Sequence, residues 1–273
     1  MILKIIKVFE EGGPYYLEDL DPHAKRPEAH PYWLGSGAKR LGLLDRPFKH
    51  QDFLKALAGI NPRTKEEMRR RYRGTRMIQR DGEGKLLHAT AAWDFTFSPF
   101  KDFSTLWAIS PGMLQQVLVR LHHAAIQHTL QGLEPEVGFT RKGKGGESVE
   151  RVACLWAVFP HFTSRALDPQ LHHHVLLVNW GILPDGSGGA IHASPWFSKE
   201  GELTRKWNQV YTEALMEGLS QWLDASVTAH RDDQGWITDV SIDGIPPALS
   251  AFFSKRSEQL RAAAGQNPSP SQL

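Results

Sequence analysis

The sequence has one cysteine, Cys154, so an internal disulfide framework is excluded. This residue lies in the apolar run Val-Ala-Cys-Leu-Trp, where we expect a small buried side chain. The sequence also lacks any apolar run of about eighteen residues, and the segment "MILKIIKVF" carries no cleavage site. We therefore expect a protein of a reducing cytoplasm that does not insert into a membrane.

The sequence has little net charge, because 32 Lys and Arg oppose 30 Asp and Glu. Contact with nucleic acid would therefore require locally concentrated basic residues rather than a uniformly basic surface. Residues 63–80 hold eight Lys or Arg against two Glu, and residues 141–146 form a second basic stretch that is rich in glycine. A solvated face or loop explains either stretch equally well. The candidate phosphate contacts are Arg69, Arg70, Arg71, Arg73, Arg76, Arg141, Lys142 and Lys144.

The apolar patterns predict strands that alternate with amphipathic helices. Strands are expected over residues 2–9, 86–98, 149–159 and 173–182, and helices over 50–58, 110–134, 202–225 and 246–264. The third and fourth strands are apolar on both faces, which indicates a sheet covered on both sides by helices. We expect one domain over residues 1–265 and a flexible tail or truncated linker over 266–273.

Four histidines are concentrated in "HFTSRALDPQLHHHVLLVNW", which spans residues 161–180. Residues two apart in a strand share a face, so His172 and His174 point together while His173 faces the other way. His161 ends the preceding strand and reaches the same point if the two strands pair antiparallel. Three neutral nitrogen ligands with open positions are typical of a catalytic divalent-metal site. The alternative is a set of hydrogen-bonded core and surface histidines, which we expect for His122 and His123 on the long helix.

Asp94 is the carboxylate expected to orient one of these histidines, because metal-bound imidazoles usually donate their second N–H to a carboxylate. In "WDFTFS" it alternates with Trp93, Phe95 and Phe97, so it lies on the face opposite the aromatic side chains. An exposed residue on an edge strand is the alternative interpretation. Tyr15 and Tyr16 follow the first strand directly after a Gly-Gly-Pro breaker.

Three motifs together resemble a known family. They are the tyrosine pair, "WDFTFSPFKDFSTLW" over residues 93–107, and "HFTSRALDPQLHHHVLLVN" over residues 161–179. In this order they are similar to the N-terminal relaxase domain of the MobF class of conjugative relaxases, within the HUH endonuclease superfamily. The resemblance covers nearly the whole chain. It implies an α/β (α+β) fold with a central antiparallel β-sheet flanked by helices on both faces.

The resemblance also implies an activity: cleavage of one strand of single-stranded or hairpin origin-of-transfer DNA, with the DNA held on a tyrosine. Carried over to this chain, Tyr15 is the first-choice nucleophile and Tyr16 the second, Asp94 orients a ligand, and the metal ligands are His161, His172 and His174. The expected ion is Mg²⁺ or Mn²⁺, with Zn²⁺, Ni²⁺ or Co²⁺ as alternatives. The expected partners in a bacterial cytoplasm are relaxosome accessory and coupling proteins and a C-terminal helicase domain.

Members of this class commonly have a second tyrosine or tyrosine pair several residues after the first. Only Tyr32 is available here, in a sequence context that matches the family poorly. Two other functions stay open from the residues: a single-stranded DNA-binding module without cleavage, and a metal-dependent phosphoesterase that uses bound water. A covalent protein–DNA adduct distinguishes the relaxase from both.

Overall fold

The structure is a computed structural model of the chain and describes most of the sequence. The described residues are 2–9, 12–18, 30–44, 46–69, 79–80, 86–87, 90–164, 166–197 and 200–255. The tail predicted over 266–273, and the part of the last predicted helix beyond Lys255, lie outside this set. No helix in these ranges combines the length and the apolar character that are needed to cross a bilayer.

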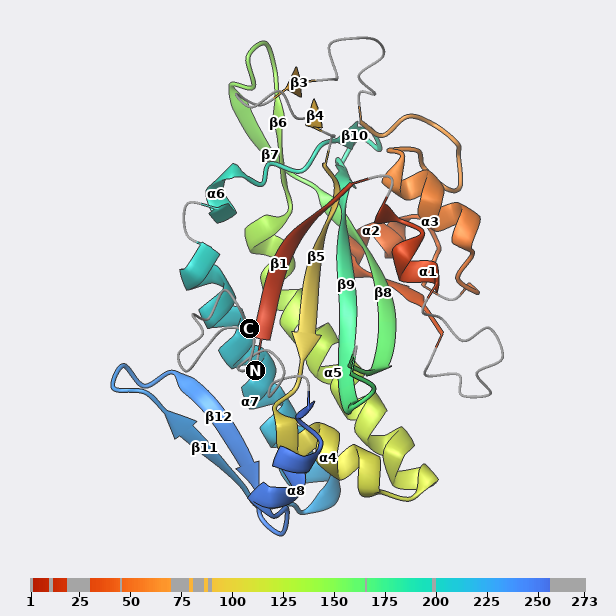
Figure 1. Cartoon of the computed structure of the whole chain (residues 1–273). Helices are drawn as coiled ribbons and strands as arrows, with labels where there is room; N and C mark the ends of the chain where they lie inside the picture. Colours follow the sequence, from red (N-terminus) through yellow and green to blue (C-terminus); the bar gives the residue numbers. More distant parts are fainter. Residues whose placement is uncertain are drawn as a thin grey trace.

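A six-stranded antiparallel sheet forms the centre of the molecule (Figure 1). In spatial order its strands are β1 (Ile2–Phe9), β5 (Thr90–Ser98), β9 (Pro169–Ile182), β8 (Ala153–Thr163) and β2 (Tyr32–Leu34), and β10 (Gly188–Gly189) pairs with the end of β9. Separate two-stranded ribbons join β3 (Gln79–Arg80) to β4 (Leu86–Leu87), β6 (Phe139–Lys142) to β7 (Ser148–Arg151), and β11 (Val227–Arg231) to β12 (Ile237–Ile242). All four predicted strands contribute to the central sheet.

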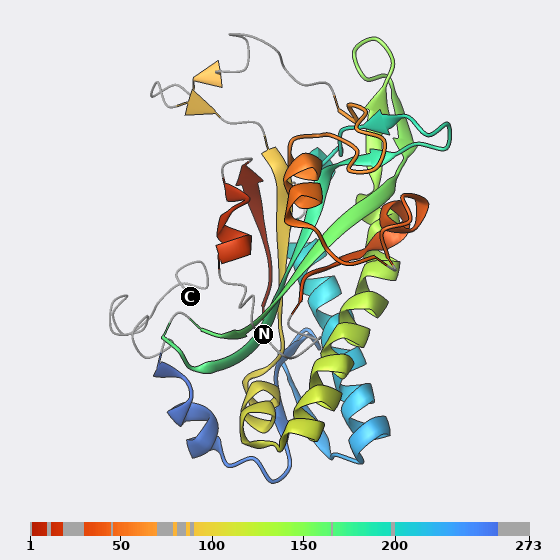
Figure 2. The same cartoon turned by 90° about the vertical axis from the view of Figure 1, so that its right-hand side faces the viewer.

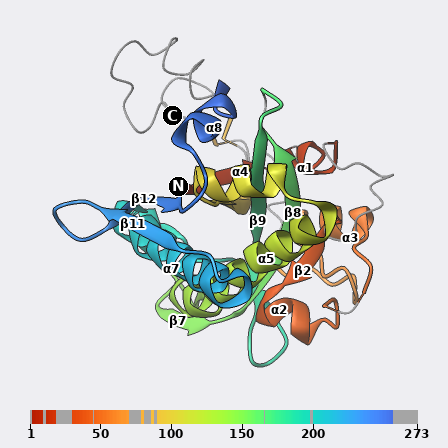
Figure 3. The same ribbon diagram turned by 90° about the horizontal axis from the view of Figure 1, so that it is seen from below.

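Helices cover both faces of this sheet. They are α1 (Tyr15–Glu18), α2 (Gly35–Arg40), α3 (His50–Leu57), α4 (Lys101–Ile109), α5 (Gly112–Val137), α6 (Ser194–Phe197), α7 (Glu200–Leu223) and α8 (Pro247–Phe252). The long helices α5 and α7 pack side by side on one face (Figure 3), whereas α1 and α3 pack on the other, and Figure 2 shows α1 across the sheet from α5 and α7. The predicted fold class is therefore confirmed.

The two-sided cover explains the unbroken apolar run of β9. Val175 and Leu177 join the core beneath α5 and α7, while Leu176 and Val178 join the core beneath α3. A strand buried on both faces needs apolar residues at successive positions, so it loses the simple alternation of a half-exposed strand. The polar side chains at the start of β9 therefore differ from the apolar residues that fill the rest of this strand.

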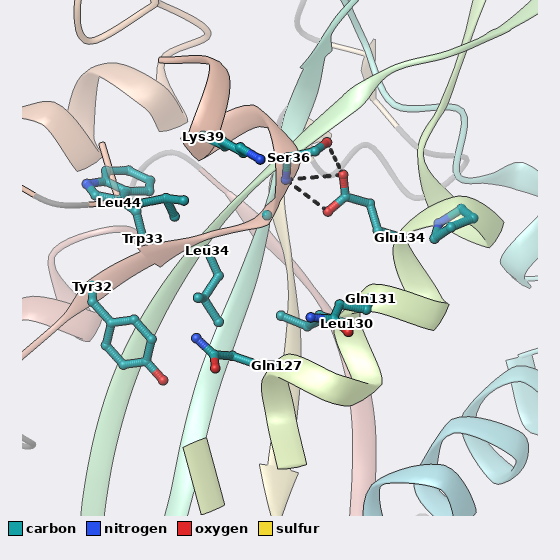
Figure 4. Close-up of a pocket in the computed structure, with 12 residues that line it drawn as sticks. Tyr32, Trp33, Leu34, Ser36, Lys39, Leu44, Gln127, Leu130, Gln131 and Glu134 are labelled. Carbon is teal, nitrogen blue, oxygen red and sulfur yellow. Dashed lines mark hydrogen bonds between the residues drawn. The ribbon is translucent and has the colours of Figure 1, made fainter. Parts of the chain in front are cut away.

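Helix α2 and strand β8 are attached to α5 through Glu134, and Figure 4 shows its contact with Ser36 of α2. Its carboxylate accepts hydrogen bonds from the backbone N–H of Cys154 at 3.2 Å and of Ser36 at 3.2 Å, and from the Ser36 hydroxyl. The backbone of α2 lies directly on β8, since a Cβ atom at Gly37 would be 2.6 Å from the Cys154 carbonyl oxygen. The Glu134 carboxylate thus accepts hydrogen bonds from the N–H and hydroxyl groups of Ser36 at the start of the short helix α2.

Candidate active site

Three histidines meet on the face of the sheet that carries α1. His161 of β8 pairs directly with His172 of β9, and His174 follows two residues later on the same face. One ligand nitrogen from each ring lies within 4.8 Å of the other two, and the ring centroids are 5.0–5.3 Å apart. The antiparallel pairing of β8 and β9, which was the condition for His161 to reach the other two histidines, thus brings these three rings together.

The donor set fits a divalent metal ion. The Nε2 atom of His161 is buried and has no hydrogen-bond partner among the residues that the structure describes, which is costly for a polar atom unless a ligand satisfies it. Burial, and next the neighbouring His174 and His172, lower the pKa of His161 to about 3, so this imidazole is neutral at physiological pH. Three imidazoles whose ring nitrogens meet at one spot match the open, three-ligand sites of metal-dependent enzymes.

Asp94 connects this cluster to the neighbouring strand β5. Its Oδ2 atom lies 2.6 Å from Nδ1 of His174, and the Thr96 hydroxyl donates to its Oδ1 atom at 3.3 Å. The carboxylate is almost completely buried, at 2% exposure. With Nδ1–H donating to Asp94, His174 keeps its Nε2 lone pair for a metal ion.

The two tyrosines of α1 differ in environment. Tyr16 is buried and its hydroxyl donates to Oδ2 of Asp94 at 3.1 Å, while its ring packs edge-on against His174 at 5.4 Å between centroids. Burial, and then the Asp94 carboxylate, raise the pKa of Tyr16 above its ordinary value. Tyr15 is 41% exposed and contacts Tyr16 edge-on at 5.2 Å. The structure therefore places Tyr16 against the carboxylate and leaves Tyr15 open to solvent.

His173 faces the opposite side of the sheet, as predicted. Its Nδ1 atom lies 2.9 Å from Nε2 of His122, and the Tyr211 hydroxyl lies 2.8 Å from Nδ1 of His122. All three side chains are buried, and burial lowers the pKa of both histidines well below the ordinary value. The packing role expected for His122 is confirmed, whereas its bond to the middle histidine of the triplet was not anticipated.

The predicted DNA-contacting residues lie in different surroundings. The Arg69 guanidinium donates to the carbonyl oxygens of Leu57 at 2.8 Å and Thr90 at 3.0 Å, which gives it a local structural task. Arg70, Arg71, Arg73 and Arg76 lie outside the described residues. The other three lie in the β6–β7 hairpin, where Arg141 and Lys144 are exposed and Lys142 lies within ion-pair distance of Glu150 and Asp185. Phosphate contact by these side chains stays a prediction.

Tyr32 lies on the other face of the sheet. It pairs with Val158, three residues from His161, so its side chain points away from the histidines and toward α5. There it lines a cavity of about 740 Å³ together with Leu34, Gln131 and Glu134 (Figure 4). Within the described part of the chain its buried hydroxyl has no hydrogen-bond partner, and burial raises its pKa. This placement does not suit a second nucleophile at the metal cluster.

Sequence reasoning missed one residue of the site, Thr96, and one contact between predicted residues, from Tyr16 to Asp94. Thr96 supports both Asp94 and His174, and the only signal for it was its position two residues after Asp94 in the same strand. The hydrogen bond from Tyr16 to Asp94 had no signal, because it depends on how α1 folds back over the sheet.

Solved structures of relaxases resemble this chain in sequence and in fold. Conjugative relaxase TrwC in complex with oriT DNA, in a metal-bound structure, is 25% identical, covers 99% of this chain and 88% of its own, and has a TM-score of 0.75. A copper-bound structure of TrwC with oriT DNA has the same identity and coverage and a TM-score of 0.78.

Sequence comparisons agree with the structural ones. "Multifunctional conjugation protein TraI" of Escherichia coli is 29% identical over 283 residues, which covers 97% of this chain but only 14% of that relative. The sequence profile described as TrwC relaxase matches residues 7–272. The chain, with its histidine cluster, its buried aspartate and its tyrosine pair, belongs to the TrwC relaxase family.

Proposed function

We propose that this chain is the DNA-nicking part of a conjugation protein. It binds single-stranded or hairpin DNA at an origin of transfer and cuts one strand by transesterification to a tyrosine. One observation carries the proposal: the Tyr16 hydroxyl and the metal-facing His174 share one buried carboxylate, Asp94. This arrangement places a tyrosine segment, a proton acceptor and a metal site within one small volume.

Tyr15 is the nucleophile that the surroundings favour. An exposed phenol can reach a bound strand, whereas the Tyr16 hydroxyl is committed to Asp94 and its raised pKa makes the phenolate harder to form. In the proposed step, the Tyr15 oxygen bonds to phosphorus while the bond from phosphorus to the 3′ oxygen breaks. The tyrosine proton passes to Asp94, and the departing 3′ oxygen takes up a proton from solvent water, so the released strand ends in a 3′-hydroxyl; Asp94 later returns its proton to solvent. Because one phosphodiester replaces another, the step runs backward without a nucleotide cofactor.

The three histidines would hold the metal ion, which supplies Lewis-acid stabilisation of the non-bridging phosphoryl oxygens when bound. Asp94 and Thr96 fix the ring of His174, so that its free nitrogen faces the other two rings. We propose Mg²⁺ or Mn²⁺ as the working ion, because both keep exchangeable positions for a phosphate oxygen. Zn²⁺, Ni²⁺ and Co²⁺ also suit imidazole donors.

The larger context of the protein is also a proposal. The chain spans 14% of the length of TraI, a relative described as multifunctional. We propose that it works in a bacterial cytoplasm with relaxosome accessory and coupling proteins, and that the native protein continues into a helicase domain.

The test is formation of a covalent adduct. The protein is incubated with Mn²⁺ and a labelled single strand that spans the origin of transfer of the parent element, and a denaturing gel separates the products. A slow-migrating protein–DNA species is expected, and Tyr15→Phe combined with Tyr16→Phe should abolish it. Binding without any adduct would identify a non-cleaving DNA-binding module. Cleavage that survives both substitutions would identify a phosphoesterase that uses water.

A further inference from the structure

The edge strand β1 presents two exposed side chains on the face that carries the histidines. Lys4 pairs with Thr96, and Thr96 pairs with His174, so these three residues form one row across β1, β5 and β9. Residues paired across strands share a face, which places Lys4 beside the Asp94–His174 pair. Strands are about 4.8 Å apart, so Lys4 begins roughly 10 Å from His174 and extends a flexible four-carbon stem.

No side chain in the described ranges forms a hydrogen bond or ion pair with the Lys4 ammonium, in contrast to Lys142 of the β6–β7 hairpin, which lies near two carboxylates. Ile6 pairs with Asp94 in the next row on the same face and is 45% exposed. The Tyr16 ring packs against His174 of β9 and Phe159 of β8, which lie two and three strands away from β1. An exposed cation and an exposed apolar side chain thus flank the catalytic carboxylate.

We infer that Lys4 and Ile6 form a subsite for the DNA strand next to the scissile phosphate. The Lys4 ammonium holds a neighbouring phosphate, and Ile6 packs against the adjoining sugar or base. A single strand combines repeated negative charges with apolar base and sugar surfaces, and this strip offers a partner for each. The inference rests on the proposed function, since it assumes that DNA crosses the histidine cluster.

A competing explanation is that Lys4 only protects the sheet edge. Edge strands often carry lysines that prevent pairing with another chain. That role would apply equally to Lys7, which is exposed on the same strand but pairs with Trp93 and so lies on the opposite face. The two lysines therefore form a matched pair that separates DNA contact from edge protection.

The test compares Lys4→Gln with Lys7→Gln, which remove the same charge from the same strand. Binding of a fluorescent oligothymidylate is measured by anisotropy over a range of salt concentrations, with thermal melting and Mn²⁺ titration as controls for the fold and the metal site. For Lys4→Gln we expect roughly five- to tenfold weaker binding, and a slope of log K against log salt that is smaller by about 0.7. Lys4→Arg should keep the slope of the unsubstituted protein, and Lys7→Gln should change neither quantity.

Adduct formation supplies the second readout. With origin DNA, Lys4→Gln should require a higher DNA concentration for half-maximal adduct formation, while Mn²⁺ affinity and the melting temperature stay unchanged. Equal effects of Lys4→Gln and Lys7→Gln, or an unchanged salt slope, would overturn the inference. If the unsubstituted protein forms no adduct, the proposed cleavage fails, but the salt slopes still decide whether Lys4 contacts DNA.

Discussion

The Nδ1 atom of His174 lies 2.6 Å from Oδ2 of Asp94, although 80 positions separate the two residues in the chain. Pairing of β5 with β9 brings them together, and the Tyr16 hydroxyl donates to the same carboxylate oxygen at 3.1 Å. Asp94 therefore couples the tyrosine segment to the metal-facing histidines. Such an outer carboxylate fixes the tautomer and orientation of the imidazole that it contacts.

Replacement of Asp94 by asparagine should weaken Mn²⁺ binding by about 10- to 100-fold, because His174 loses its charged acceptor. Isothermal titration calorimetry measures this change. Asp185→Asn removes the same charge from an exposed turn and should leave the affinity unchanged. Similar losses in both variants would show that net charge, rather than orientation of His174, governs metal binding.

The middle histidine of the triplet provides a control for the ligand set. His172→Gln should remove a ligand and lower Mn²⁺ affinity by roughly 100-fold or more, whereas His173→Gln, one position away on the other face, should retain metal binding. Equilibrium dialysis against Mn²⁺ distinguishes the two variants. Loss of metal from His173→Gln with retention in His172→Gln would mean that the ligand set is shifted by one residue.

The tyrosine pair should divide into a nucleophile and a positioning residue. Tyr15→Phe should reduce the rate of adduct formation by at least about 1,000-fold, because it removes the nucleophile and the neighbouring Tyr16 hydroxyl is buried against Asp94. Tyr16→Phe should keep a measurable rate, lowered by about 10-fold, since it removes only a hydrogen bond to Asp94. Single-turnover kinetics on denaturing gels give both rates. The opposite ranking would make Tyr16 the nucleophile.

The free energy of unfolding should decrease as the pH is lowered below about 6.5, the ordinary pKa of histidine. Burial lowers the pKa of His122 and His173 in the folded chain, so below this pH the unfolded chain takes up protons that the folded chain does not. Each buried histidine then contributes a loss of up to about 1.4 kcal/mol per pH unit, and above this pH neither contributes. Urea unfolding in EDTA at pH 7.5 and about pH 5 measures the slope.

His161 adds a third group of this kind in the metal-free protein, since its pKa is lowered to about 3. His122→Gln removes one of these three groups. It should therefore make the free energy of unfolding depend less steeply on pH, even if it lowers that free energy at pH 7.5. An unchanged slope in His122→Gln would contradict the assignment of a neutral buried imidazole.

Glu134 should matter for stability but not for catalysis. Glu134→Ala leaves the backbone N–H of Cys154 and the Ser36 donors without their acceptor, and should cost about 1–3 kcal/mol of unfolding free energy. Mn²⁺ affinity and the rate of adduct formation should not change, because the histidines lie on the other face of the sheet. Chemical denaturation measures the loss of unfolding free energy, and metal titration measures the Mn²⁺ affinity. A variant that loses Mn²⁺ affinity together with stability would contradict the prediction.

Much of the site was predictable because strand geometry is periodic. The alternation of polar and aromatic residues in β5 predicted the face of the sheet on which Asp94 lies. The two-residue spacing of His172 and His174 predicted that their side chains lie on one face. The position of His161 followed from assuming an antiparallel hairpin, which the register of β8 and β9 shows.

The missed features depend on contacts between elements that are distant in sequence. Nothing local indicates that the Tyr16 hydroxyl reaches Asp94, 78 positions away, or that His122 on α5 contacts His173 on β9. Nor does the segment over residues 235–244 indicate locally which strand it pairs with. That segment supplies β12, which pairs with β11, and the turn lies at Asp232, whose side chain accepts the N–H groups of Gln234 and Trp236.

The most direct test of the central claim is mass spectrometry of the peptide that carries DNA after reaction with origin-of-transfer single strands in Mn²⁺. The account predicts one modified peptide that contains Tyr15 and bears a nucleotide through a phosphotyrosine bond, and none when EDTA replaces the metal. A DNA-linked peptide from any other region, or an adduct that forms equally well in EDTA, would contradict it.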